Sequence, residues 1–251
     1  MKRTRILIKF PTRSRPEKFK AVLNKYIDNL SGKHDVHFVI SMDRDDGSMN
    51  TVEMRSFLDA IASRVSLIYH YGDSKTKIEA INADMAGENA DILVLASDDM
   101  VPQVKDYDDI IASDMAHYFP DLNGALNYND GYHKEKRQDL MTLSVLGWRL
   151  YEEWGYIYHP AYISLYADKE QTEVCRRTGR IVDLPQCIIK HEWPRQEEHD
   201  ALMQRNENEA MYARDSAVFR YRKKWRFGIN TLGARVYRML HLRFGTMRIK
   251  L

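Results

Sequence analysis

The first hundred residues of the chain alternate four times between a short apolar run and a helix-like pattern. The apolar runs cover residues 5–10, 36–42, 65–71 and 91–97, and polar and apolar residues hardly alternate within them. Such strands are buried on both faces, which is typical of parallel sheets covered by helices. The alternation therefore predicts an α/β fold with a Rossmann-like, mostly parallel central sheet flanked by helices.

The segments between the apolar runs have helical spacing. Apolar side chains recur every three or four residues within 19–30, 54–61 and 78–85, as on one face of an amphipathic helix. We expect Gly32 to lie near the end of the first helix and Ser74 to cap the third. These helices would cover the faces of the sheet.

The pattern changes after Pro120. Residues 122–130 and 139–148 indicate strands, or a strand followed by a short helix. Residues 166–179 predict a helix that a glycine terminates, and two short strands are expected around Pro185. No clear helix separates the strands here, so this half of the chain differs from the regular alternation before it.

Each of the four predicted strands is followed by polar or charged residues. These loops are PTRSRP (11–16), MDRDDG (42–47), YGDSK (71–75) and SDDM (97–100). The carboxyl ends of parallel strands meet at one edge of the sheet, and ligands of open α/β folds bind there. We therefore expect the four loops to line one site.

Two adjacent carboxylates, Asp98 and Asp99, end the fourth apolar run. Like charges at the tip of a buried strand cost stability unless a cation lies beside them. Oxygen ligands suit Mg²⁺ or Mn²⁺, which commonly bind one or two carboxylates together with substrate phosphates. An arginine or lysine partner, or a solvated turn, is the alternative.

Composition and charge restrict the remaining possibilities. No stretch approaches the ~20 apolar residues that would span a bilayer, and the apolar run near the N-terminus is too short for a signal peptide. The two cysteines, Cys175 and Cys187, fit no disulfide or metal framework, which favours a reduced, cytoplasmic protein.

The C-terminal part of the chain is basic. Residues 196–214 are polar and predicted to be helical, and residues 214–251 contain eleven Lys and Arg against one acid. Such a segment suits DNA or the anionic inner face of a membrane. A helix pair that packs on the main domain with its basic face in water is the third alternative.

Five motifs together resemble the GT-A glycosyltransferases, nearest to family 2. They are PTRSRP, SMDRDD, LASDDM, YADKEQTEVCRRTGRI and IIKHEWP, in an order that spans residues 5–194. Two departures are present: the metal motif is Ser-Asp-Asp instead of Asp-x-Asp, and Ala167 replaces the acidic residue that usually precedes Asp168. The resemblance implies a GT-A fold and a nucleoside-diphosphate sugar as donor, most simply a UDP-sugar.

The resemblance also implies roles for individual residues. Arg15 would reach phosphate, Asp43 would bind a base N–H, and Asp98 would contact ribose or a metal-bound water. Asn82 would face the nucleotide, or else pair locally. The residues expected to bind the donor are Pro11, Thr12, Arg13, Arg15, Asp43, Asn82 and Asp98, and those expected to bind Mn²⁺ or Mg²⁺ are Asp99 and His191.

The acceptor half of the site is expected to carry a general base. Asp168 would take the proton of an acceptor hydroxyl, which implies inversion at the anomeric carbon. Glu170 competes for this role, and an aspartate that merely favours a helix N-terminus is the simpler alternative. For Trp148, Trp154, Tyr156 and Tyr158, packing in the core is the first expectation, and stacking on sugar or base faces is the alternative.

We therefore expect a metal-dependent, inverting hexosyl- or pentosyltransferase with a hydroxyl acceptor on a glycan or glycolipid. Its catalytic domain would cover residues 1–195, with a nucleotide-sugar half (1–103) and an acceptor half (104–195), and residues 196–251 would form a helical basic extension. Alternatives are a phage-type DNA glycosyltransferase acting on hydroxymethylated bases and a non-catalytic nucleotide or nucleic-acid binding module. A nucleotidyltransferase is disfavoured because no glycine-rich phosphate loop follows the first strand.

Overall fold

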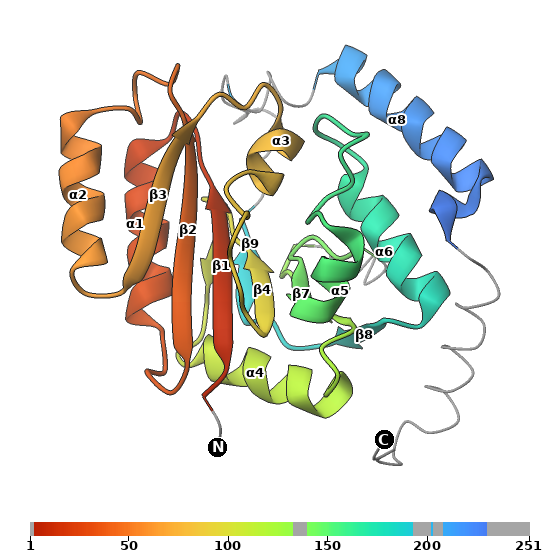
Figure 1. Ribbon diagram of the computed structural model, residues 1–251, viewed down its shortest axis with the longest axis horizontal. Coiled ribbons are helices and arrows are strands. Elements are labelled where there is room, and N and C mark those ends of the chain that lie inside the picture. Colours follow the sequence, from red (N-terminus) through yellow and green to blue (C-terminus); the bar gives the residue numbers. More distant parts are fainter. Residues whose placement is uncertain (1–2, 133–139, 193–201, 203–207, 230–251) are drawn as a thin grey trace.

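The computed structural model describes residues 3–132, 140–192, 202 and 208–229 (Figure 1). A seven-stranded sheet runs through it in the order β3-β2-β1-β4-β7-β6-β8. The strands are β1 Arg5–Pro11, β2 Asp35–Asp43, β3 Ser66–Gly72, β4 Ile92–Leu95, β6 Ala125–Tyr128, β7 Val145–Gly147 and β8 Ile181–Leu184. The first four are mutually parallel, and only β7 runs antiparallel to its neighbours. The predicted mostly parallel sheet is confirmed.

Helices cover both faces of this sheet, as predicted. They are α1 Pro16–Asp28, α2 Val52–Ala62, α3 Lys77–Asn82, α4 Tyr107–Tyr118, α5 Trp148–Trp154, α6 Ala167–Thr178 and α8 Glu209–Lys224, followed by a 3₁₀ turn, η2 Arg226–Gly228. Apolar residues of α1, α2 and α4 pack on one face, and those of α3, α5, α6 and α8 pack on the other. Figure 1 shows α8 on the outer side of α6.

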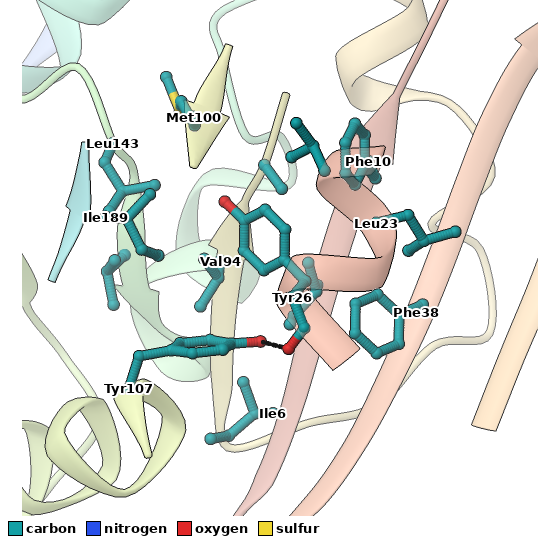
Figure 2. Close-up of a cluster of buried hydrophobic side chains, with 14 of the residues drawn as sticks. Ile6, Phe10, Leu23, Tyr26, Phe38, Val94, Met100, Tyr107, Leu143 and Ile189 are labelled. Atoms are coloured by element: carbon teal, nitrogen blue, oxygen red, sulfur yellow. Dashed lines mark hydrogen bonds between the residues drawn. The ribbon is translucent and has the colours of Figure 1, made fainter. Parts of the chain in front are cut away.

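Strand β1 explains why its apolar run hardly alternates. Ile6, Ile8 and Phe10 belong to the core beneath α1, whereas Leu7 belongs to the core on the opposite face. In Figure 2, side chains from distant parts of the chain surround Tyr26 in the first of these cores. The hydroxyl of Tyr107 donates to the backbone carbonyl of Tyr26 at 3.1 Å, so this aromatic contact is also a polar one.

Helix boundaries follow local signals, with two differences from the sequence analysis, both at α3. Thr76, not Ser74, caps α3: its side chain accepts a hydrogen bond from the N–H of Glu79. Helix α3 is also shorter than expected and ends at Asn82, so Met85 lies beyond it. The predicted termination of α6 is confirmed, because Gly179 adopts φ 72°, a conformation that glycine reaches without strain.

Two elements were not expected from the sequence. Helix α4 follows the fourth loop, and a three-residue strand, β5 (Met100–Pro102), pairs antiparallel with β9 (Ile189–His191) to form a second, two-stranded sheet. The two strands expected around Pro185 are confirmed as β8 and β9. A strand of three residues is too short to show an alternation of polar and apolar side chains, so the sequence pattern does not predict β5.

Of the basic C-terminal segment, the structure describes α8 and η2. Phe219 and Phe227 pack into the core beside α6, so in the described residues this segment packs on the domain. The predicted helix over 196–214 falls largely outside the described residues, as does the basic tail beyond residue 229. Among the described helices, none has the length and apolar character needed to cross a bilayer.

Candidate active site

A single cleft at the carboxyl ends of the parallel strands brings together nine of the ten predicted site residues. They are Pro11, Thr12, Arg13, Arg15, Asp43, Asp98, Asp99, Asp168 and His191. In the strand order, β1 has β2 on one side and β4 on the other. The loops after β1 and β4 therefore separate at a topological switch point, where such sheets bind ligands.

Asn82 is the exception, because it does not line the cleft. Its side-chain amide oxygen accepts hydrogen bonds from the backbone N–H groups of Ile157 and Tyr158, at 2.8 and 3.1 Å. Its amide nitrogen donates to the carbonyl of Tyr158 at 2.7 Å. Asn82 therefore ties the end of α3 to the segment after α5, so it neither lines the cleft nor pairs with residues near it in the sequence.

The loop after β1 forms one wall of the cleft. Arg13 donates to Asp43 at 2.7 Å and to Asp45 at 2.6 Å, and these contacts raise the pKa of its guanidinium even though burial opposes them. The N–H of Ser14 donates to the buried Asp46 at 2.6 Å, in a backbone conformation with φ 63°. The loop is thus held by three carboxylates, one at the end of β2 and two just after it.

Asp98 pairs with an arginine. Its carboxylate accepts a hydrogen bond from Arg15 at 3.0 Å, and both side chains are largely buried. Burial is the main cause of the raised pKa of Asp98; the charge of Asp99 adds to it, while Arg15 opposes it. For Asp98, the neighbouring positive charge is therefore the guanidinium of Arg15.

Asp99 lies beside His191 because β5 pairs with β9. The pairing sets Met100 opposite His191, and the His191 Nε2 atom is 3.6 Å from a carboxylate oxygen of Asp99. The hydroxyl of Ser97 donates to the other oxygen. Burial opposes ionisation of Asp99, but His191, Ser97 and Lys77 outweigh it and hold the pKa of this carboxyl well below its usual range.

These donors fit a cation that is shared with a substrate. Asp99 is ionised and, with His191, offers an oxygen and a nitrogen ligand. The described residues contain no group of three or more His, Cys, Asp or Glu side chains arranged to hold a metal ion. A divalent ion here would complete its coordination with phosphate oxygens and water, as Mg²⁺ commonly does.

Asp168 faces the same cleft from the first turn of α6. One carboxylate oxygen accepts a hydrogen bond from the N–H of Lys169 at 2.7 Å. Burial raises the pKa of Asp168, and the charges of Lys77 and His191 act against this rise. Because Lys77 and His191 influence both Asp99 and Asp168, the two carboxylates share one electrostatic environment.

Glu170, the competing candidate for the base, is engaged elsewhere. It is buried and does not line the cleft. Arg222 donates to both of its carboxylate oxygens, and the hydroxyl of Tyr162 donates to one of them at 2.6 Å. Its contacts are therefore those of a residue that joins α6 to α8.

Several lining residues were missed by sequence reasoning. They include Lys77, Thr142 and Ser164. Lys77 lies two residues beyond the third polar loop, so extending that loop by two residues would have found it. Thr142 and Ser164 belong to the acceptor half, where no regular pattern marks them. Of the four aromatic residues expected in the core, Trp148 and Tyr158 are confirmed as buried.

No model of a known protein family and no curated protein sequence matches the chain. Solved structures do match. A mannosyltransferase, PcManGT from Pyrobaculum calidifontis in complex with GDP-Man and Mn²⁺, is 14% identical with a TM-score of 0.65 over 96% of this chain and 71% of its own.

Two further structures match over shorter spans. Residues 1–349 of S. aureus TarS, in complex with UDP-GlcNAc, are 12% identical with a TM-score of 0.58 over 78% of this chain and 62% of that one. Glucosyl-3-phosphoglycerate synthase from Mycobacterium tuberculosis, in complex with Mg²⁺ and UDP, is 15% identical with a TM-score of 0.50. The match covers 78% of this chain and 74% of that one. With the sheet order and the position of the cleft, these likenesses establish that the chain has the GT-A fold of nucleotide-sugar glycosyltransferases.

Proposed function

We propose that this protein is a metal-dependent, inverting glycosyltransferase that moves a sugar from a nucleoside-diphosphate sugar to a hydroxyl acceptor. The observation that carries the proposal is the meeting of Asp99, His191 and Asp168 in one cleft, around the charge of Lys77. Neighbours of the same fold were solved with GDP-Man and Mn²⁺ or with UDP and Mg²⁺, which supports a nucleotide and a divalent ion here.

The donor would lie along the wall formed by the loops after β1, β2 and β4. Asp43, oriented by Arg13, accepts a base N–H, and a pyrimidine such as uracil is the first choice. The hydroxyl of Thr12 is buried and has no hydrogen-bond partner in the described part of the chain, so it is available to the nucleoside. Lys77 provides positive charge for the diphosphate.

Asp99 and His191 would hold Mn²⁺ or Mg²⁺, and such an ion neutralises the leaving diphosphate when bound. Asp168 takes the proton from the acceptor hydroxyl as its oxygen attacks the anomeric carbon and the bond to the diphosphate breaks. A raised pKa brings this carboxylate closer to the operating pH, which favours a general base. Displacement in one step inverts the anomeric configuration.

The outer face of α8 supports a phosphate-bearing partner. Tyr221 and Trp225, one turn apart, are 67% and 64% exposed, and Arg220 and Lys224 beside them make no ion pair with any described residue. Exposed aromatic rings among cations suit the interface of an anionic membrane. We therefore place the acceptor on a membrane-associated glycan or glycolipid, with hydroxymethylated DNA bases as the alternative.

A thermal-shift panel of UDP- and GDP-sugars, with and without Mn²⁺, tests this function. A donor at 100 times its Kd stabilises the folded state by about 2.7 kcal/mol. For a chain of this size that corresponds to a rise in Tm of roughly 5–10 °C. We expect one nucleotide series to give this rise, and to give it only with the metal.

The Asp99→Asn variant should lose the metal-dependent part of the shift. Asp106→Asn is the matched control, because Asp106 is exposed, lies outside the cleft and adopts φ 60°, which asparagine tolerates equally well. The function is contradicted if no nucleotide shifts the Tm, or if Asp99→Asn keeps the full metal dependence. Donor binding without any turnover would instead indicate a binding module.

A further inference from the structure

The loop between α5 and α6 forms the acceptor side of the cleft without regular structure of its own. Ser164, Leu165 and Tyr166 line the cleft, and the loop runs directly into α6, which carries Asp168. Tyr166 is the N-cap residue of α6, but its side chain makes no capping hydrogen bond and its φ is 63°. The position of this loop must therefore come from contacts with other elements.

Asp215 of α8 is the first of these contacts. Its side chain is completely buried, and its carboxylate accepts hydrogen bonds from three consecutive backbone N–H groups. The donors are Ile163 at 3.3 Å, Ser164 at 2.9 Å and Leu165 at 2.9 Å. A buried carboxylate persists only when its oxygens are satisfied, so Asp215 and the loop hold each other in place.

Arg214 reinforces this contact from the adjacent position of α8. Its guanidinium donates to Asp215 at 2.6 Å and to the carbonyl oxygen of Ala161 at 3.2 Å. The loop is therefore held at Ala161 by an arginine and at residues 163–165 by a carboxylate. Both belong to the same helix.

Arg222, two turns further along α8, holds the first turn of α6, into which the loop runs. It forms a two-pronged pair with Glu170, with N–O distances of 2.8 and 2.7 Å, and Tyr162 donates to the same carboxylate. Glu170 lies in the first turn of α6. Paired hydrogen bonds between guanidinium and carboxylate fix geometry as well as distance, so α8 also orients the turn that carries Asp168.

The anchored loop reaches the opposite wall as well. The carbonyl of Ile163 accepts a hydrogen bond from the N–H of Ile78 at 3.3 Å, next to Lys77. The hydroxyl of Ser164 is buried, lines the cleft and has no partner in the described part of the chain. The loop thus presents an available hydroxyl while it connects α8 to α3.

We propose that Asp215 and Arg222 are positioning residues for the transfer reaction. They hold residues 161–166 and the first turn of α6, and thereby set Asp168 opposite Asp99 and His191. This inference rests on the proposed function. It gives α8 a role in catalysis that is separate from any partner bound on its outer face.

The test uses the full chain with Asp215→Asn, Arg222→Gln or Arg222→Lys. The probe is the nucleoside-diphosphate sugar with the largest metal-dependent thermal shift, and the readout is release of nucleoside diphosphate with water as the acceptor. We expect the kcat of Asp215→Asn and Arg222→Gln to fall about 10- to 100-fold, the loss that a displacement of ~1 Å causes. The donor Kd should stay within about twofold, because among the described residues no hydrogen bond or ion pair joins α8 to the loops after β1, β2 and β4.

Two further measurements separate positioning from a general loss of structure. Amide hydrogen exchange of residues 161–168 should accelerate in Asp215→Asn, and Arg222→Lys should recover part of the lost kcat. Lys223→Gln is the matched control: it breaks an ion pair between α8 and Glu173 of α6 that does not touch the loop, and it should leave kcat within about twofold of the wild type.

The inference is overturned if Asp215→Asn turns over at the wild-type rate, or if its donor Kd and kcat worsen together. The inference is also overturned if Lys223→Gln lowers kcat as strongly, because the loss would then follow from breaking any contact between α8 and α6. A wild-type protein that binds no donor contradicts the proposed function itself. In that case exchange at residues 161–168 still shows whether Asp215 anchors the loop.

Discussion

Asp168 and Lys9 are both ionisable groups whose surroundings disfavour their charged forms. Burial raises the pKa of the Asp168 carboxyl, and it lowers the pKa of Lys9 to about 8, against the charges of Asp84 and Glu88. Only Asp168 lines the cleft. A shift of this kind therefore marks a functional residue only where the geometry also brings it to a site.

Asp168→Asn should abolish turnover while donor binding remains. Loss of a general base typically costs about 10²- to 10⁴-fold in kcat, whereas the donor wall is untouched. Product release and donor Kd, measured on the same preparation, check this. A variant that keeps more than a tenth of the wild-type kcat would exclude Asp168 as the base.

The same variant should be more stable at neutral pH. The folded chain binds a proton at Asp168 more tightly than the unfolded chain, whose pKa is about 3.9. The wild type therefore loses stability as pH rises from that value through the raised folded pKa. Urea unfolding should show the advantage of Asp168→Asn growing between about pH 4 and pH 7, and a constant difference would contradict it.

Lys9 should make the free energy of unfolding depend on pH in the alkaline range. Its ammonium group is fully buried, donates to the carbonyl of Ala83 at 2.7 Å and contacts the hydroxyl of Ser41. The folded chain binds a proton less tightly than the unfolded chain, whose pKa is about 10.4. The free energy of unfolding should therefore increase between about pH 8 and pH 10.4.

Lys9→Met should lose this increase. It should also be destabilised by about 1–3 kcal/mol, because the Ala83 carbonyl loses its donor and the charge of Asp84 loses the neighbouring ammonium group. Urea unfolding at pH 7.5, 9 and 10 measures both effects. An unchanged slope against pH would show that Lys9 is not the titrating group.

At the scale of elements, short strands decide the site. The pairing of β5 with β9 brings His191 to Asp99, and the antiparallel β7 closes the sheet between β4 and β6. Three-residue strands contribute few hydrogen bonds of their own. Their positions depend on close packing with neighbouring loops, which makes them sensitive to small changes in volume.

Gly147, at the junction of β7 and α5, illustrates this sensitivity. A Cβ atom there would lie 2.2 Å from the carbonyl oxygen of Leu122, a backbone atom that cannot rotate away. Gly147→Ala should cost about 1–3 kcal/mol or more of unfolding free energy. In Gly47→Ala, the control, a Cβ meets nothing within 4 Å, and urea unfolding should find it nearly neutral. Equal effects of the two changes would contradict the packing argument.

For the whole molecule, the C-terminal segment has two sides with different roles. The inner side of α8 joins the domain through Asp215, Phe219 and Arg222, and its outer side leaves aromatic rings and cations exposed. The boundary expected near residue 195 stays a prediction, because residues 193–201 lie outside the described part of the chain. We expect the proposed binding of an anionic surface to depend on this outer side as a whole.

The double variant Arg220→Gln/Lys224→Gln should bind vesicles that contain anionic lipid more weakly than the wild type. Each Lys or Arg near such a surface contributes about 1 kcal/mol, so the two together correspond to roughly a 30-fold loss in affinity. Co-sedimentation with anionic and neutral vesicles measures this. Ala217→Gln, a neutral change at another exposed position of α8, is the control.

Equal binding to neutral vesicles would contradict the membrane proposal. Binding to duplex DNA that falls steeply with salt concentration, through release of counterions, would favour the DNA alternative.

Sequence patterns alone predicted the parallel half of the sheet, the helices that follow its first three strands, and the polar loops after β1, β2, β3 and β4. The spacing of apolar residues and helix capping each involve only a few neighbouring residues, so both can be recognised in the sequence. The resemblance placed Asp99 and His191 at one metal, but only the three-dimensional packing showed that β5–β9 pairing brings them together, that Asn82 ties two segments together, and that Glu170 binds Arg222. The packing also placed Asp215 against Ser164, which lies 51 residues earlier. Such contacts depend on how elements pack in three dimensions, and no local pattern encodes a partner so distant along the chain.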